Sequence, residues 1–219
     1  MPKISLKRQK KELAKPKKQL ELLANGIFKN GSLPTFKSKL EATNHFPLRP
    51  YALEILQINV GYMCNQVCAH CHVDAGPDRK EIMTKDTLQQ CLGVLKSSGV
   101  HTLDLTGGAP EMNPHFRWFV EEASKIGVQN FIVRSNLTIL MANKKYDDLP
   151  VFFKTHNIHI VSSMPHWTQG KTDQQRGKGV FNRSIEALKK LNHIGYGLPD
   201  SKLKLDLVYN PSGAFLPGD

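Results

Sequence analysis

Three of the chain's four cysteines lie within eight residues, as Cys64, Cys68 and Cys71. Their spacing, C-x3-C-x2-C, puts three soft sulfur donors on one short segment that directly follows an apolar, β-branched run at 53–60. Cysteines crowded in this way hold metal more often than they build a disulfide framework. The sequence therefore predicts a metal or iron–sulfur site immediately after a strand.

Two kinds of site fit this cluster. A structural zinc ion takes four ligands, and His70 or His72 would complete a Cys3His set. An iron–sulfur cluster is held by cysteine thiolates, and three of them leave one iron of a four-iron cluster open for chemistry. Cys91 is a poor fourth ligand, because it shares an apolar helical stripe with Leu88 and Leu92. The spacing therefore favours the iron–sulfur cluster.

A second unusual segment is TGGAPE, at residues 106–111. Gly107 and Gly108 have no Cβ, so the backbone here can approach a ligand closely and offer its carbonyl oxygens. A glycine pair followed by proline is also an ordinary turn. Its place after the next strand along the chain makes it a candidate partner of the cysteine segment.

The elements that must position these groups alternate between strands and helices. Apolar, β-branched runs predict five strands, at 53–60, 101–107, 130–136, 158–164 and 202–210. Helical periodicity fills the intervals, and one helix is expected to have Asn113 as its N-cap and Pro114 in its first turn. Such alternation is typical of an α/β fold with parallel strands. Polar residues at strand ends, among them Ser135 and Asn136, are therefore expected at one edge of the sheet.

Charge is divided unevenly along the chain. The net charge is +11, and residues 1–50 contain 12 Lys and Arg against 3 Asp and Glu, whereas 51–219 is nearly neutral. We expect a basic N-terminal extension (1–50) and an α/β core (51–219). No aromatic side chains alternate with the N-terminal lysines, which favours a solvated arm over a nucleic-acid surface. The sequence has no apolar run of membrane-spanning length and no secretory signal, which favours a cytoplasmic protein without a membrane partner.

Together these segments resemble the radical S-adenosylmethionine (SAM) enzymes. CNQVCAHC resembles the family's cysteine motif, and TGGAPE resembles its glycine-rich segment. The resemblance implies a partial (βα)6-type barrel, with about five βα units present. It also implies that Cys64, Cys68 and Cys71 hold a [4Fe–4S] cluster whose fourth iron binds SAM. An electron from the cluster, supplied by a reductant such as flavodoxin or ferredoxin, would cleave SAM to methionine and a 5′-deoxyadenosyl radical.

The same resemblance implies a set of SAM contacts. The adenine would lie beside His70, the amino group at the glycine-rich segment, and the ribose or carboxylate at the end of the third strand. The residues concerned are His70, Gly107, Gly108, Glu111, Ser135 and Asn136.

Longer phrases narrow the resemblance to the arsenosugar-biosynthesis branch of the family, called ArsS. They include LEILQINVGYMCNQVCAHCHVDAGPDRKEIM, RSNLT and QRGKGVFNRSIEALKKLN. That branch is thought to couple the adenosyl group of SAM to trivalent dimethylated arsenic, which implies a small-molecule substrate such as dimethylarsenite. A radical SAM enzyme with another substrate, such as a peptide, is the nearest alternative. A zinc-stabilised binding module is a third.

Three features depart from that branch or have two interpretations. Members of the branch continue beyond the position of Asp219, so the chain resembles a C-terminally shortened form, either a fragment or an enzyme with impaired activity. His166 and Trp167 occupy the place of a Cys-Tyr pair, and His166 is either a metalloid ligand or an ordinary hydrogen-bonding residue. The stretch 175–179, QRGKG, is either an anion clasp or a solvated loop.

Overall fold

The computed structural model describes residues 4–5, 7–12, 15–25, 34–49, 51–69 and 71–210. They belong to two compact units. One runs from Ser5 to Leu53, and the other contains Ile4 and the residues from Glu54 onward. The division into a basic extension and a catalytic core, predicted from charge, stays a prediction.

The N-terminal unit contains two short helices, α1 (Pro16–Asn25) and α2 (Phe36–Ala42). The Thr35 side chain caps α2 by accepting a hydrogen bond from the Ser38 backbone N–H at 3.2 Å. No residue of α2 is buried, so this helix has no apolar core of its own. The solvated arm predicted from the lysine-rich sequence is compatible with this exposure.

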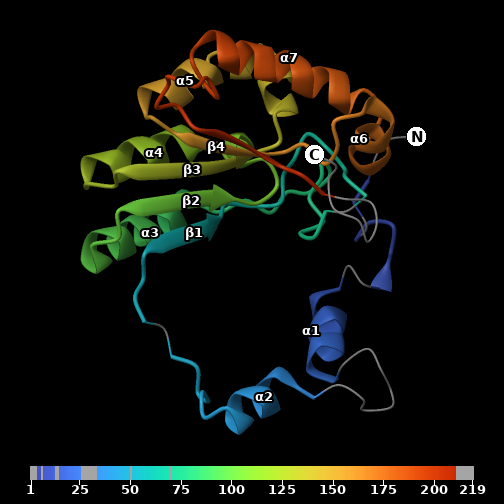
Figure 1. Cartoon of the computed structure of the whole chain (residues 1–219), viewed down its shortest axis with the longest axis vertical. Helices are drawn as coiled ribbons and strands as arrows, with labels where there is room; N and C mark the ends of the chain where they lie inside the picture. Colours follow the sequence, from blue (N-terminus) through green and yellow to red (C-terminus); the bar gives the residue numbers. More distant parts are fainter. Residues whose placement is uncertain are drawn as a thin grey trace. The chain divides into compact units, whose positions relative to one another are not determined.

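The second unit is built on five parallel strands in the order β1-β2-β3-β4-β5. Their bounds are Ile55–Asn59, Thr102–Thr106, Asn130–Ser135, His159–Ser163 and Leu205–Val208. All five predicted strands are confirmed, each somewhat shorter than its apolar run. Because the strands are parallel, their carboxyl ends share one edge, and Figure 1 shows the loop after β1 extending from that edge.

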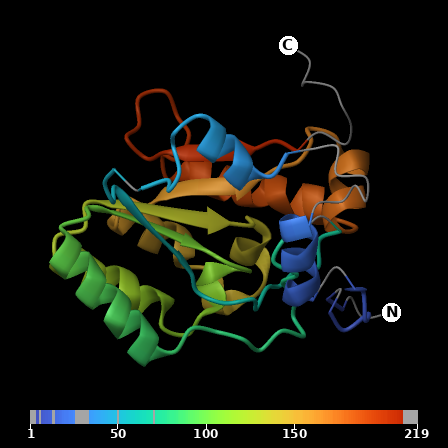
Figure 2. The same ribbon diagram turned by 90° about the horizontal axis from the view of Figure 1, so that it is seen from below.

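Apolar rows across the sheet form the core. Ile58, Leu105, Val133 and Ile160 are partners in register on adjacent strands, and at most 5% of each is exposed. The helices that contribute to this core are α3 (Lys85–Ser98), α4 (Phe116–Lys125), α5 (Leu149–Thr155) and α7 (Val180–His193). In Figure 2 the green helix α3 lies alongside the sheet. Helix α6 (Gln169–Arg176) contributes no residue to this core.

The sheet also has a polar row. The buried Asp104 carboxylate accepts hydrogen bonds from Gln57 Nε2 at 2.7 Å and from Arg134 Nη2 at 2.8 Å. These side chains come from three neighbouring strands, and Arg134 reaches the cavity described below. A buried carboxylate is tolerated here because charged and neutral donors both satisfy it.

The start of α4 differs from the prediction. The helix begins at Phe116 with His115 as its N-cap, so Pro114 precedes the first turn and Asn113 lies outside the cap position. Asn113 Oδ1 accepts from the His115 backbone N–H at 2.9 Å, and its Nδ2 donates to the backbone oxygens of Val60 and Met83, each at 3.0 Å. The asparagine joins the two ends of the cysteine-bearing loop, a long-range role that local helix signals do not reveal.

One helix of the second unit is not predicted by the sequence patterns. Helix α6 covers the beginning of the stretch that was expected to be an anion clasp or a loop, and it ends at Arg176 before Gly177. Its sequence is strongly polar and has no apolar stripe, so periodicity gave no signal for it. Among the helices that the structure describes, none is both long and apolar enough to cross a membrane.

Candidate functional site

The cysteines lie on the loop that connects β1 to α3, and the two ends of this loop pair with each other. Tyr62 N donates to Glu81 O at 2.8 Å, and Met83 N donates to Val60 O at 3.0 Å. Farther out, Cys64 N donates to Gly76 O at 3.2 Å. These backbone bonds fix the base of the loop, so its sulfur-bearing part starts from a defined position.

Arg79 holds the returning part of this loop. Its guanidinium hydrogen-bonds both the backbone and the carboxylate of Asp74, and its Nε donates to Glu81 at 3.0 Å. It also lies over the Tyr62 ring, 4.7 Å from the centroid. Only 9% of the Arg79 side chain is exposed, so these contacts are more than a surface ion pair. The composition of the loop predicted no such clamp.

The glycine pair touches the cysteine loop directly. Gly108 N donates to Gly61 O, and Ala109 N donates to Met63 O, both at 2.9 Å. A Cβ on Gly108 would lie 2.3 Å from the Met63 oxygen, and Gly107 has φ +136. The close backbone approach expected of these glycines is therefore made to the loop that carries the cysteines, although both glycines also line the cavity.

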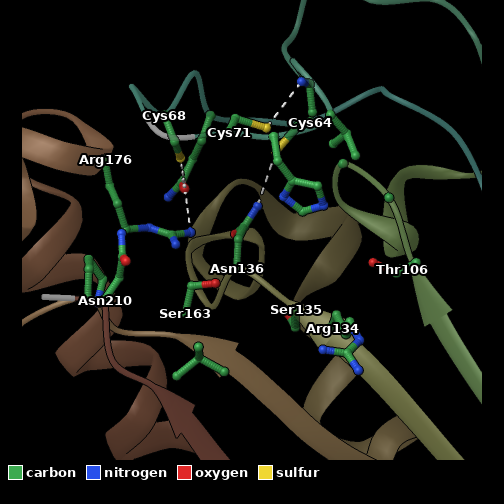
Figure 3. A pocket seen from close by; sticks show the side chains of 18 of the residues that line it. Cys64, Cys68, Cys71, Thr106, Arg134, Ser135, Asn136, Ser163, Arg176 and Asn210 are labelled. Carbon is green, nitrogen blue, oxygen red and sulfur yellow. Dashed lines mark hydrogen bonds between the residues drawn. The ribbon is translucent and has the colours of Figure 1, made fainter. Parts of the chain in front are cut away.

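All three cysteines line one cavity of about 540 Å³. Figure 3 shows them on the loop along one side, with Arg176 and Asn210 at one end and Ser135 and Arg134 opposite. Cys64 is buried, Cys68 and Cys71 are partly exposed, and none is in a disulfide. Burial raises the pKa of Cys64 to about 11. This sulfur therefore keeps its proton at neutral pH unless a cation stabilises the thiolate.

The arrangement of donors suits a cluster better than a single ion. Across the described residues, no three His, Cys, Asp or Glu side chains converge as the ligands of one metal ion would. In a four-iron cluster each thiolate binds a different iron. Three sulfurs around one cavity are therefore suitable ligands for such a cluster. His72 lines the cavity, whereas His70, the expected adenine neighbour, lies outside the described residues.

Ser135 and Asn136, at the end of β3, line the same cavity, as predicted from the strand ends. Glu111 is not among the lining residues. Its carboxyl is buried beside the Ser135 hydroxyl, and burial raises the pKa of Glu111 to about 7, an effect that Ser135 partly opposes. Neither carboxyl oxygen has a hydrogen bond of good geometry to the described residues. A direct contact between Glu111 and SAM was expected from the resemblance. In the structure Ser135 lines the cavity and Glu111 does not, so Glu111 is not placed for that contact.

Arg176 is the site residue that the sequence left most uncertain. It is 4% exposed, lines the cavity from the end of α6, and donates from Nη2 to Gln66 Oε1 at 2.9 Å. Its Nε is buried without a hydrogen-bond partner among the described atoms. A buried guanidinium with an unused donor beside a cavity favours an anionic ligand. Lys178, the other basic residue of the expected clasp, is exposed.

His166 is an ordinary hydrogen-bonding residue in this structure. Its Nδ1 accepts from the Thr168 backbone N–H at 3.1 Å, and burial together with Lys171 lowers the pKa of His166. The ring stacks on Trp167 with centroids 4.2 Å apart, and Trp167 stacks on Tyr209 at 5.4 Å. His166 does not line the cavity, whereas Tyr209 does. The metalloid-ligand interpretation of His166 gains no support from this placement.

The family model described as "Radical SAM superfamily" matches residues 58–203. The chain belongs to the radical SAM superfamily. Membership implies a [4Fe–4S] cluster and SAM as cofactors. It favours the iron–sulfur interpretation of the cysteine motif over the zinc one, in agreement with the donor arrangement.

Similar proteins include other radical SAM enzymes. A probable GTP 3′,8-cyclase of Saccharolobus islandicus (strain M.14.25 / Kamchatka #1) is 25% identical over 159 residues, which is 72% of this chain and 48% of the relative. A probable GTP 3′,8-cyclase of Sulfolobus acidocaldarius is 24% identical over 164 residues, 74% of this chain and 49% of that protein. The chain thus spans about half the length of these radical SAM relatives.

Solved structures show the same fold. The structure of anSMEcpe with bound AdoMet has a TM-score of 0.55 at 17% identity and covers 71% of this chain and 43% of that one. Streptococcus suis SuiB has a TM-score of 0.55 at 13% identity, with coverages of 90% and 51%. At these identities the likeness concerns the radical SAM fold alone. It agrees with the partial barrel of five parallel strands expected from the sequence.

Proposed function

We propose that this chain holds a [4Fe–4S] cluster on Cys64, Cys68 and Cys71, binds SAM beside it and cleaves SAM reductively. The observation that carries the proposal is the meeting of these three thiols with the glycine pair around one cavity at the carboxyl edge of the sheet. When bound, the cluster and SAM supply a 5′-deoxyadenosyl radical. The residues of the chain bind, orient and shield these groups.

The cavity offers a complementary group for each end of SAM. The backbone oxygens of Gly107 and Gly108 are acceptors for its ammonium group. Arg176 is the cation for its carboxylate, because this guanidinium is buried and its Nε makes no hydrogen bond to the described atoms. Ser135 lines the cavity with a buried hydroxyl that makes no hydrogen bond of good geometry within the described part of the chain, which suits the ribose. The buried Glu111 carboxyl lies beside this hydroxyl, outside the cavity lining. The adenine contact proposed for His70 completes the set.

We further propose that the substrate is a trivalent dimethylated arsenic compound and that the adenosyl group is coupled to its arsenic. Support for this substrate comes from the resemblance of the phrases around Cys64, Ser135 and Arg176 to the arsenosugar-biosynthesis branch. Addition of the carbon radical to the arsenic lone pair would leave one electron in excess, and return of that electron to the oxidised cluster would give a pentavalent dimethylarsinoyl product. The electron that first cleaves SAM would come from a reductant such as flavodoxin or ferredoxin, in a reducing, cytoplasmic setting that keeps the cysteines available.

The test is anaerobic reconstitution followed by product analysis. Wild-type protein should bind about four irons and four sulfides per chain, and with SAM, dithionite and dimethylarsenite it should yield an arsenic–adenosyl adduct detected by mass spectrometry. Parallel reactions would contain GTP or a peptide in place of the arsenic compound. 5′-Deoxyadenosine without the adduct would retain the radical SAM activity but reject arsenic as the substrate.

Cysteine variants test the ligand assignment. Cys64→Ala, Cys68→Ala and Cys71→Ala should each lose the brown colour and SAM cleavage. Cys91→Ala is the matched control, because Cys91 lies on α3 and does not line the cavity. A colourless wild-type protein that binds one zinc, or cluster loss in Cys91→Ala equal to that in the other three variants, would overturn the assignment.

A further inference from the structure

Asn136 contacts one of the three cysteine sulfurs. Its Nδ2 lies 3.4 Å from Cys64 Sγ, and both residues are buried. The second hydrogen on Nδ2 points to Asn65 Oδ1, at 2.7 Å. Figure 3 shows the Asn136 side chain directed from the end of β3 towards the cysteine loop, with a dashed line to Cys64.

The orientation of this amide is determined by its other contacts. Asn136 Oδ1 lies 3.0 Å from the Ile139 backbone nitrogen and 3.1 Å from the Thr138 hydroxyl. A backbone N–H can only donate, so the amide atom facing Ile139 must be the oxygen. The nitrogen therefore faces Cys64. Both hydrogens and the oxygen are engaged within the protein, so the amide has no unused donor for SAM.

Thr138, two residues beyond Asn136 in the segment after β3, links the same arrangement to the cysteine loop. Its hydroxyl lies 2.6 Å from Gln66 Nε2 and 3.0 Å from Asn65 Nδ2, which are both potential donors to it. Asn136, Thr138 and the two loop residues thus form a connected polar network between β3 and the cysteine loop. In such a network the position of each amide depends on its neighbours. The hydrogen bond to Cys64 is therefore preorganised before any cofactor binds.

We propose that Asn136 is a positioning residue that raises the reduction potential of the cluster through its hydrogen bond to Cys64. The inference rests on the proposed function, because it assumes that Cys64 is a cluster ligand. Hydrogen bonds to ligating sulfurs set iron–sulfur potentials. A donor withdraws charge from the thiolate, and this favours the reduced cluster, which carries one more negative charge. Cys71 Sγ has a comparable donor, the Ala75 backbone N–H at 3.3 Å, which a side-chain substitution does not remove.

Asn136→Asp is the most direct test. Aspartate keeps an oxygen for Ile139 and Thr138, replaces the donor to Cys64 with an acceptor and adds a negative charge. Asn136→Leu removes the donor without adding charge. At the wild-type midpoint potential, where half of the cluster is reduced, we expect the reduced-to-oxidised ratio to fall about tenfold in Asn136→Asp, which corresponds to about 59 mV for one electron. Asn136→Leu should shift in the same direction.

Asn143→Asp is the matched control. Asn143 lies in the same β3-to-α5 connection, and its Oδ1 accepts from Lys145 N, a bond that aspartate preserves. Its side chain is exposed, and it does not line the cavity, so its midpoint should equal that of wild type. The readouts are an EPR-monitored redox titration together with iron and sulfide content and circular dichroism for each protein.

The possible results separate the two proposals. A wild-type protein without a cluster would overturn the proposed function, and this inference with it. A wild-type cluster whose midpoint is unchanged in both Asn136 variants would overturn this inference alone. A shift in Asn136→Asp without one in Asn136→Leu would assign the effect to charge and reject the hydrogen bond as its cause. Loss of the cluster from both folded variants would show that Asn136 is needed for assembly and would also reject the tuning role.

Discussion

Glu111→Gln should stabilise the protein progressively as the pH rises from about 4.5 to about 7. In the folded protein burial raises the pKa of Glu111 from 4.5 to about 7. A carboxyl whose pKa is higher in the folded state binds a proton more tightly there than in the unfolded chain. Its contribution to stability is therefore fully present below pH 4.5 and is lost as the pH rises through 7. Glutamine, which does not titrate, removes this loss.

The size of the effect follows from the two pKa values. Each pKa unit corresponds to about 1.36 kcal/mol, so the shift of Glu111 makes the wild-type protein about 3 kcal/mol less stable at pH 8 than at pH 4 on account of this residue. The glutamine side chain fits the same volume beside the Ser135 hydroxyl. The gain of Glu111→Gln over wild type should therefore approach about 3 kcal/mol at pH 8 and be small at pH 4.

Urea unfolding at pH 4, 5, 6, 7 and 8 measures this difference directly, with equal slopes for variant and wild type as the condition for comparison. Glu121→Gln, at an exposed position on α4, is the control for removal of a surface carboxylate. If the free-energy difference for Glu111→Gln were flat over this range, or fell with rising pH, the carboxyl would not be a buried acid and the reasoning would fail.

Three further substitutions test the cavity wall and the sheet. Gly108→Ala puts a Cβ 2.3 Å from a backbone oxygen of the cysteine loop. It should therefore lower the free energy of unfolding by about 1–3 kcal/mol and reduce the amount of iron bound on reconstitution. An unchanged iron content would contradict the close packing of Gly108 against this loop. Arg176→Gln should weaken SAM binding about tenfold to a hundredfold, measured by calorimetry on reconstituted protein, because a charge-assisted hydrogen bond contributes about 1.5–3 kcal/mol. Lys178→Gln, at an exposed position, should bind SAM like wild type, and equal losses in both variants would point to general electrostatics. Asp104→Asn should lower the unfolding free energy by about 1–3 kcal/mol, because it weakens the buried hydrogen bonds with Arg134 and Gln57. A urea midpoint equal to that of wild type would show that the Asp104 carboxylate is not needed for stability.

The strands and the shared edge followed from the sequence because they depend on short-range patterns. Apolar β-branched runs mark strands wherever both faces of a sheet are covered, and parallel order then puts the cysteines, the glycines and Ser135 at one edge. The predicted strands were too long, because flanking residues such as Leu53, Ile158 and Met164 continue the apolar pattern beyond the residues paired in register.

Features that depend on a distant partner could not be predicted. The glycine pair signalled close backbone approach, but only the fold reveals that the approached atom is the oxygen of Met63. Asn113 resembles an N-cap in sequence, yet its amide joins Val60 and Met83. Arg176 lies in a polar stretch without apolar periodicity. Its burial depends on tertiary packing and could not be predicted from the local sequence.

The backbone bonds among the cysteine loop, its returning segment and the glycine pair divide the loop into a frame and an insert. Residues 60–63 and 76–83 form the frame, because they are paired with each other and with Gly108. The insert, 64–75, carries all three sulfurs. Engineers who wish to graft a different ligand spacing onto this scaffold could exchange the insert while leaving the frame untouched.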